Sequence, residues 1–128
     1  MLCTTPLFHV SAVAMCLHLS LYAASELVIH RRFDARQVLD TIASAHVTRM
    51  AGVPTVFHDL LHAAGPDERS RLGSLRSCYS GAAPLPAEML ERLENVTGCA
   101  IYEGYGASDA GPCLTYNPVH ARRNPGPE

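Results

Sequence analysis

Strand-like apolar segments alternate with amphipathic helical segments along this chain, and this alternation constrains the fold more than any other feature. The segments typical of strands are 26–30, 47–51, 75–79 and 99–102, and those typical of helices are 12–22, 34–45, 55–64 and 86–97. When helices connect successive strands, the crossovers are right-handed and the strands run parallel. The sequence therefore predicts an α/β fold of alternating β-α units with a mainly parallel sheet.

Capping residues set the boundaries of the predicted helices. Asp34 can cap a helix N-terminus, and Gln37 three residues later completes a capping box. Thr55 is expected to cap the next helix, and Gly98 is expected to end the last, at 86–97. Beyond Gly111 the pattern is lost, so residues 112–128 are expected to form an extended tail.

The composition is that of one modest globular domain. The chain has 128 residues, of which 48% are hydrophobic and 17% charged, so it can bury a core. Its net charge of −2 is not that of a nucleic-acid-binding protein, and no nucleic-acid partner is expected. The apolar run 10–29 contains polar residues such as His18 and Glu26, which are costly in a bilayer. A buried helix followed by a strand is expected there, and no transmembrane segment.

Cysteines and histidines show no metal-binding pattern. The five cysteines are scattered without a C-x-x-C pair, which is typical of reduced thiols in a cytoplasmic protein. His58 and His62 have the i, i+4 spacing of one helix face, but no third ligand follows nearby. Two partly exposed helix histidines are therefore expected, not a zinc site.

The ten basic residues are all arginines, and the chain has no lysine. A phosphate-binding lysine, a Schiff-base lysine and a catalytic lysine are therefore excluded within these 128 residues. Any chemistry that depends on such a group must draw it from outside this chain.

Glycine-containing loops follow three of the predicted strands, at 52–55, 81–84 and 104–106. Ligands of parallel α/β sheets bind beyond the carboxyl ends of the strands, so these loops are expected to line one shared site. The stretch 102–109 carries glycines that permit close backbone approach, aromatic rings, a hydroxyl at Ser108 and a carboxylate at Asp109. These groups suit a nucleotide and a hard cation such as magnesium.

Four motifs occur in the order seen in adenylate-forming enzymes. They are Pro-Leu-Phe-His at 6–9, Gly-Val-Pro-Thr at 52–55, Ser-Gly-Ala-Ala-Pro at 80–84 and Glu-Gly-Tyr-Gly-Ala-Ser-Asp at 103–109. From about Leu2 to Gly126 the chain resembles this AMP-binding superfamily, in its acyl-CoA synthetase (fatty-acid–CoA ligase) branch. The resemblance implies part of the large N-terminal domain of an enzyme that activates a carboxylic acid with ATP and Mg²⁺ and transfers the acyl group to coenzyme A.

The resemblance also implies roles for individual residues. The nucleotide-binding set would be Gly81, Ala82, Ala83, Pro84, Glu103, Gly104, Tyr105, Gly106 and Ser108. Within that set Glu103 would accept from the adenine amino group, Tyr105 would stack on the adenine, and Ser108 would bond the α-phosphate. Asp109 would hold magnesium, and it forms with Ser108 the implied catalytic pair. His9 and Gly81 would lie near the acyl substrate.

Simpler structural roles remain open for three of these residues. Tyr105 could be a core aromatic, Asp109 could cap a turn, and His9 could be a structural histidine. Ser108 and Asp109 also depart from the threonine and glutamate usual in the family. The shorter aspartate reach makes its distance to a metal less favourable.

The resemblance implies that residues 1–128 are a partial AMP-binding domain. The lysine-bearing phosphate loop and the C-terminal domain with its catalytic lysine are not in the sequence, so the missing portions of a parent enzyme are expected partners. The isolated chain is expected to be inactive as a ligase. Two alternatives remain: a fragment of a peptide-synthetase adenylation domain that loads a carrier protein, which the motif around His9 disfavours, and a non-catalytic α/β nucleotide-binding remnant.

Overall fold

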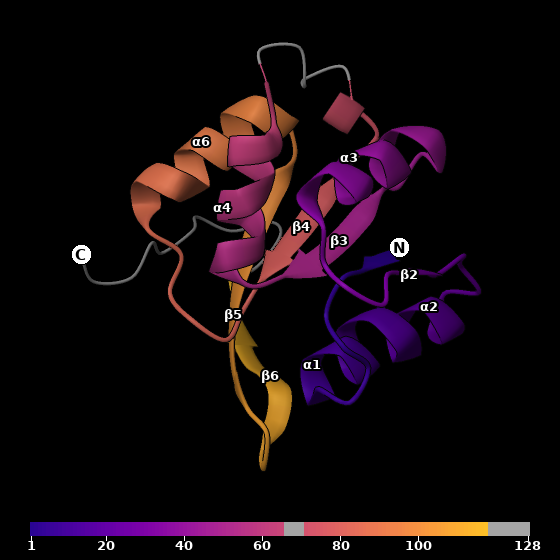
Figure 1. Ribbon diagram of the computed structural model, residues 1–128. Helices are drawn as coiled ribbons and strands as arrows, with labels where there is room; N and C mark the ends of the chain where they lie inside the picture. Colours follow the sequence, from indigo (N-terminus) through magenta and orange to yellow (C-terminus); the bar gives the residue numbers. More distant parts are fainter. Residues whose placement is uncertain (66–70, 118–128) are drawn as a thin grey trace.

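A six-stranded sheet with the strand order β2-β1-β3-β4-β5-β6 forms the centre of the fold in the computed structural model (Figure 1). The structure describes residues 1–65 and 71–117. The elements are β1 (Leu2–Cys3), α1 (Val10–Ala12), the π-helical turn η1 (Val13–His18), α2 (Leu19–Tyr22), β2 (Val28–Ile29), α3 (Ala35–Ser44), β3 (Arg49–Gly52), α4 (Pro54–Ala63), β4 (Ser77–Ser80), α6 (Ala87–Thr97), β5 (Ala100–Ala107) and β6 (Gly111–Tyr116). All neighbouring strands are parallel except β5 and β6, which are antiparallel. The predicted α/β class with a mainly parallel sheet is confirmed.

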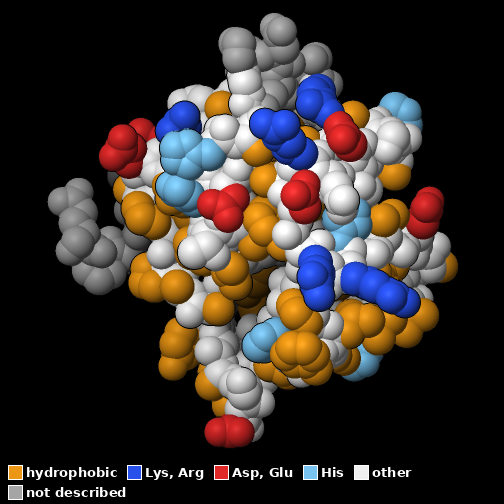
Figure 2. All heavy atoms as spheres, viewed as in Figure 1, with side chains coloured by type: hydrophobic (Ala, Val, Ile, Leu, Met, Phe, Trp, Pro, Cys, Tyr) orange, Lys and Arg blue, Asp and Glu red, His pale blue; other side chains and the backbone are white. Residues whose placement is uncertain are grey.

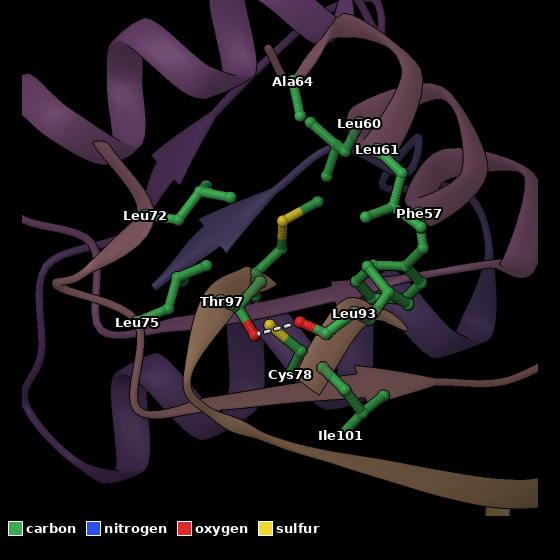
Figure 3. Close-up of a pocket in the computed structure, with 11 residues that line it drawn as sticks. Phe57, Leu60, Leu61, Ala64, Leu72, Leu75, Cys78, Leu93, Thr97 and Ile101 are labelled. Carbon is green, nitrogen blue, oxygen red and sulfur yellow. Dashed lines mark hydrogen bonds between the residues drawn. The ribbon is translucent and has the colours of Figure 1, made fainter. Parts of the chain in front are cut away.

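Helices cover the sheet on both faces, as parallel sheets require. The helices α3, α4 and α6 bury their apolar faces in one cluster that includes Ile42, Phe57 and Leu93, and the strands contribute Met50 and Ile101. Inside this cluster lies a cavity of about 10 Å³, whose lining residues are drawn in Figure 3. A space of that size is near the minimum for one water molecule, so it is a packing gap in the core and too small for a substrate.

The opposite face is covered by the continuous helical segment α1, η1 and α2 (Figure 1). A smaller cluster of Cys3, Ala12, Cys16 and Ala51 joins it to the sheet. Helix was predicted for 12–22, and the structure has it from Val10 with six residues in π-helical geometry. Among the described residues, no helix is long and apolar enough to cross a membrane.

Two of the three expected caps are present. The Asp34 carboxylate accepts a hydrogen bond of 2.8 Å from the Gln37 N–H, and Gly98 ends α6 in the left-handed conformation with φ of 68°. Thr55 does not cap α4, whose N-cap is Val53. Pro54 occupies the first helical position instead, because its fixed φ suits that position and it lacks an N–H that would need a partner.

The largest difference from the sequence analysis lies at the end of the chain. The glycine-rich segment 104–106 was expected as a loop, but β5 continues through it to Ala107. The chain then returns as β6, with Gly104 opposite Tyr116 and Tyr105 opposite Thr115. Residues 112–116 are thus a paired strand and not the start of a tail, because this pairing satisfies the backbone groups of both segments. Residues 118–128 of the expected tail lie outside the described residues.

Candidate functional site

The carboxyl ends of β3 and β4 lie side by side, level with Glu103 inside β5. Gly52 is level with Ser80, and Ser80 is level with Glu103. The Gly81 N–H donates to the Gly52 carbonyl over 3.3 Å, and a Cβ placed on Gly81 would lie 3.5 Å from the Gly104 carbonyl. The structure therefore brings the predicted site segments 52–55 and 81–84 together with the start of the third, 104–106.

Glu103 joins two of these segments. Its Oε1 atom accepts a hydrogen bond of 2.9 Å from the backbone N–H of Leu85, a residue with 4% of its surface exposed. The carboxylate thereby fixes the loop after β4 to β5. This contact uses one acceptor site of the carboxylate and leaves its other oxygen for a ligand amino group.

The side chain of Tyr79 leaves no room for a side chain at residue 104, which is a glycine. A Cβ on Gly104 would overlap the Tyr79 hydroxyl, which donates a hydrogen bond of 3.2 Å to the Cys113 sulfur on β6. Burial, followed by this contact with Cys113, raises the pKa of Tyr79 above its usual range. The sequence analysis did not single out Tyr79, since only the fold places it against β5 and β6.

The loop after β4 contains a residue in an uncommon backbone conformation. Ala82 has φ of 70°, in the left-handed region that costs a non-glycine residue about 1–2 kcal/mol. Ala82, Ala83 and Pro84 are all exposed, so their backbone is accessible to a ligand. Strain held at an exposed strand-end loop is typical of ligand-binding sites.

Tyr105 lies on the hairpin and is 67% exposed, which rules out a core role. Ser108 and Asp109 follow β5 in the exposed turn before β6. Between Glu103 and Ala107 an extended strand rises about 13 Å, so this turn is well separated from the 81–84 loop. Figure 1 shows the hairpin projecting beyond the rest of the sheet. Any one ligand that touches both regions must therefore be elongated, as a nucleoside phosphate is.

His9 is exposed and precedes α1 as its N-cap residue, without a capping hydrogen bond from its side chain. Its ring packs against Phe8 with 4.9 Å between the ring centroids. Because α1 contacts β6, His9 lies on the same side of the molecule as the hairpin. In Figure 2, hydrophobic side chains gather over the lower part of the face, where Figure 1 shows α1 and β6. Phe8, beside His9, and Tyr116, on β6, are exposed by 85% and 60%.

Two buried hydroxyls that the sequence analysis did not assign lie at the same edge. Ser80 ends β4 and Thr4 directly follows β1, and both side-chain oxygens are buried without a hydrogen-bond partner in the described structure. A buried hydroxyl without a partner is unfavourable by about 1–3 kcal/mol. Both hydroxyls are therefore available to a polar ligand or a water molecule.

No group of three or more histidine, cysteine or acidic side chains suited to a metal ion occurs within residues 1–65 and 71–117. The predicted magnesium residue Asp109 therefore belongs to no such group in the described part of the chain. The rings of His58 and His62 are in edge-to-face contact, with 4.5 Å between their centroids. Together with Glu88 and Arg92 they line a groove of about 190 Å³ between α4 and α6. None of the residues that line this groove belongs to the segments 52–55, 81–84 and 103–104.

Comparison with known proteins identifies a family that this chain matches. The model of the family described as AMP-binding enzyme matches residues 1–127. A long-chain-fatty-acid–CoA ligase of Bacillus subtilis (strain 168) is 34% identical over 122 residues, which are 94% of this chain and 21% of the relative. A feruloyl-CoA synthase of Amycolatopsis sp is 37% identical over 112 residues, which are 87% of this chain and 22% of the relative.

The crystal structure of ATP-bound MatB from Rhodopseudomonas palustris is similar in fold as well as in sequence. It matches with a TM-score of 0.85 and 29% identity over 98% of this chain and 24% of the other. The chain therefore spans about a fifth of the length of the curated relatives it matches.

Proposed function

The chain belongs to the AMP-binding enzyme family, and from this premise we propose that it carries part of the nucleotide and acyl site of an acid–CoA ligase. In that reaction a carboxylate oxygen of the acid attacks the α-phosphorus of ATP, and the bond to pyrophosphate breaks. The thiolate of coenzyme A then attacks the acyl carbon of the adenylate and displaces AMP. The two CoA ligases named above support this reaction class.

The observation that carries the proposal is the convergence of the 81–84 loop with β5 at one edge of the sheet. The Gly81 backbone approaches Gly104, and Glu103 holds the loop through Leu85. Glycine at these positions lets the loop and β5 approach each other and Tyr79 closely. This is the position where parallel α/β sheets bind nucleotides.

Within this site the adenine would lie against the backbone of 81–84, as the resemblance implies. Glu103 and Tyr105 are two residues apart on β5, so their side chains leave the same face of the strand. The free oxygen of Glu103 would accept from the adenine amino group, and the exposed Tyr105 ring would stack on the adenine. Gly104 and Gly106 would contact the nucleotide only through their backbone, as the resemblance implies.

Ser108 and Asp109 would meet the phosphate end of the nucleotide. Ser108 would donate a hydrogen bond to the α-phosphate. A single carboxylate fits magnesium, since this ion keeps several waters and takes the rest of its ligands from substrate phosphates. Asp109 would hold the ion, which neutralises phosphate charge when bound. Phe8 and the exposed His9 would face the acyl group, and Gly81 would pass beside it.

The acceptor thiol is assigned to coenzyme A in preference to a carrier protein. Both relatives named above are CoA ligases, and they act on a fatty acid and on an aromatic acid. The acid of this protein is accordingly proposed only as a carboxylic acid. The unpatterned cysteines, all five of them free thiols, favour a cytoplasmic location.

Calorimetric titration of the chain with ATP and AMP tests the nucleotide site. We expect submillimolar dissociation constants for both, and Tyr105→Ala should weaken binding by about 1–3 kcal/mol through lost stacking. The matched control is Tyr116→Ala, which removes an exposed aromatic ring from the other strand of the same hairpin. Absence of binding, or equal losses in the two variants, would refute the proposed site.

The chain itself should release no pyrophosphate when it is given ATP and carboxylic acids. It has no lysine to stabilise the charge that develops on the phosphates. Nucleotide binding without turnover is the result expected for a partial site. A complete enzyme would also release pyrophosphate, and a remnant without a ligand would not bind the nucleotide. Pyrophosphate release with any acid would overturn this part of the proposal.

A further inference from the structure

The side chain of Tyr79 runs from β4 across β5 to β6. These strands are neighbours in the order β4-β5-β6, and the Tyr79 hydroxyl donates its hydrogen bond of 3.2 Å to the Cys113 sulfur on β6. Between the two lies Gly104 of β5, where a Cβ would overlap the hydroxyl. One side chain thus links three strands, and it does so directly beside the proposed nucleotide site.

Tyr79 is anchored in the core at its base. It is half-buried and packs against the cluster of Cys3, Ala12, Cys16 and Ala51, which joins the sheet to the segment α1, η1 and α2. Burial raises the pKa of Tyr79 above its usual range, so the hydroxyl keeps its proton and can donate. The contact with Cys113 therefore starts from a well-packed part of the molecule.

The direction of the Tyr105 ring depends on how the hairpin backbone is held. Tyr105 is 67% exposed, so packing of the ring itself contributes little to its direction. The register between β5 and β6 shifts between Tyr105 and Ala107, and a bulge of this kind turns the side chains beside it. In the described sheet β6 is also the last strand, with β5 as its one neighbour.

We propose that Tyr79 is a positioning residue of the nucleotide site. It holds Gly104 on β5 and Cys113 on β6 at once, and it thereby keeps the Tyr105 ring in the orientation that stacks on the adenine. Residues 104 and 105 leave opposite faces of β5, so Tyr79 acts on Tyr105 through the backbone. The inference rests on the proposed function, which assigns the stacking to Tyr105. A ring already held in place loses less conformational freedom on binding, so affinity depends on Tyr79.

A merely structural role of Tyr79 would give a different pattern. If Tyr79 only stabilised the whole fold, its loss would speed amide exchange throughout the chain, including α6, and would leave the affinity of the folded chain unchanged. The positioning role instead predicts that the hairpin loosens locally. It also predicts a loss of nucleotide affinity that requires the Tyr105 ring.

Amide hydrogen exchange of the chain without nucleotide tests the hold on the hairpin. Tyr79→Phe removes the hydroxyl and keeps the ring, and it should speed exchange about threefold at 104–107 and 113–116, as expected for the loss of one modest hydrogen bond, and not in α6. Cys113→Ala removes the acceptor of the same bond and should act alike. The matched control is Tyr22→Phe, which removes the hydroxyl of a 92% exposed tyrosine on α2 and should change neither region.

Calorimetric titration with AMP tests whether Tyr79 acts through Tyr105. In the wild-type background Tyr79→Phe should raise the dissociation constant about threefold. In the Tyr105→Ala background the same substitution should change it by less than about 1.5-fold, because no ring is left to position. Cys113→Ala should behave like Tyr79→Phe in both backgrounds, and Tyr22→Phe should change neither constant.

The inference is overturned if the hairpin amides of Tyr79→Phe exchange as in the wild type, or if α6 loosens as much as the hairpin. It is also overturned if Tyr79→Phe leaves AMP binding unchanged, or weakens it as much without the Tyr105 ring as with it. Failure of the proposed function looks different, since the wild type then binds no AMP. The exchange measurement needs no nucleotide and still tests the hold of Tyr79 on the hairpin in that case.

Discussion

Replacing Glu103 by alanine should release the loop that follows β4. The substitution removes the acceptor of the Leu85 N–H and leaves a buried donor without a partner, which costs about 1–3 kcal/mol. The bond involves a carboxylate and Leu85 is buried, so the expected loss in the free energy of unfolding is about 2 kcal/mol. For a chain of 128 residues this corresponds to a fall in Tm of about 6–10 °C.

Urea unfolding followed by circular dichroism measures this loss, and amide hydrogen exchange locates it. The Leu85 amide should exchange up to about thirtyfold faster in Glu103→Ala, the factor that corresponds to 2 kcal/mol. Glu103→Gln keeps an oxygen acceptor at the same position and should lose less than about 1 kcal/mol.

Glu91→Ala is the matched control, because Glu91 is an exposed residue of α6, and it should change stability by no more than about 0.5 kcal/mol. The reasoning is refuted if Glu103→Ala unfolds like the wild type. It is also refuted if Glu103→Gln loses as much stability as Glu103→Ala, since the acceptor would then not be the cause.

Two further substitutions test the packing of the hairpin and the start of α3. Gly104→Ala places a methyl group on the Tyr79 hydroxyl and should cost about 2–3 kcal/mol in urea unfolding, whereas Gly65→Ala, with open space around it, should cost less than about 0.5 kcal/mol. Asp34→Ala should cost about 1 kcal/mol through the lost cap, and Asp34→Asn should restore most of it, as measured by thermal unfolding. If Gly104→Ala and Gly65→Ala were equally stable, the close contact of Gly104 with Tyr79 would be contradicted. If Asp34→Ala and Asp34→Asn were equally stable, the helix cap at Asp34 would be contradicted.

The parts of the fold that local chemistry determines could be predicted from the sequence. The apolar stripe of α3, its Asp34 cap and the left-handed Gly98 depend on residues within one or two turns of each other. The meeting of the strand ends at Gly52 and Gly81 followed from the alternation of strands and helices, since parallel strands place their carboxyl ends at one edge. The short strand β1 escaped prediction, because two residues, even fully buried ones, show no periodicity.

The hairpin could not be predicted, because contacts distant in sequence decide it. Gly104 and Gly106 are typical of loops by local preference, yet both lie in β5. A Cβ on residue 104 would overlap the Tyr79 hydroxyl, and a Cβ on residue 106 would overlap the Pro112 carbonyl. Both positions therefore need glycine. Neither partner can be inferred from the seven residues of the motif 103–109 alone.

Because the motif lies in a strand, its side chains alternate between two faces, which a loop would not impose. Successive side chains of β5 leave opposite faces, so Glu103 and Tyr105 share the face of Ile101, whereas Gly104 lies on the other face against Tyr79. One face is thus open for a ligand, and the other is closed by the Tyr79 contact with Cys113 on β6. A change at Tyr79 or Cys113 should therefore loosen the hairpin and displace Tyr105 without touching a nucleotide. Substitutions on the two faces should differ in kind: those at Tyr105 should change nucleotide affinity, those at Gly104 and Tyr79 should change stability first, and those at Glu103, which also holds Leu85, should change both.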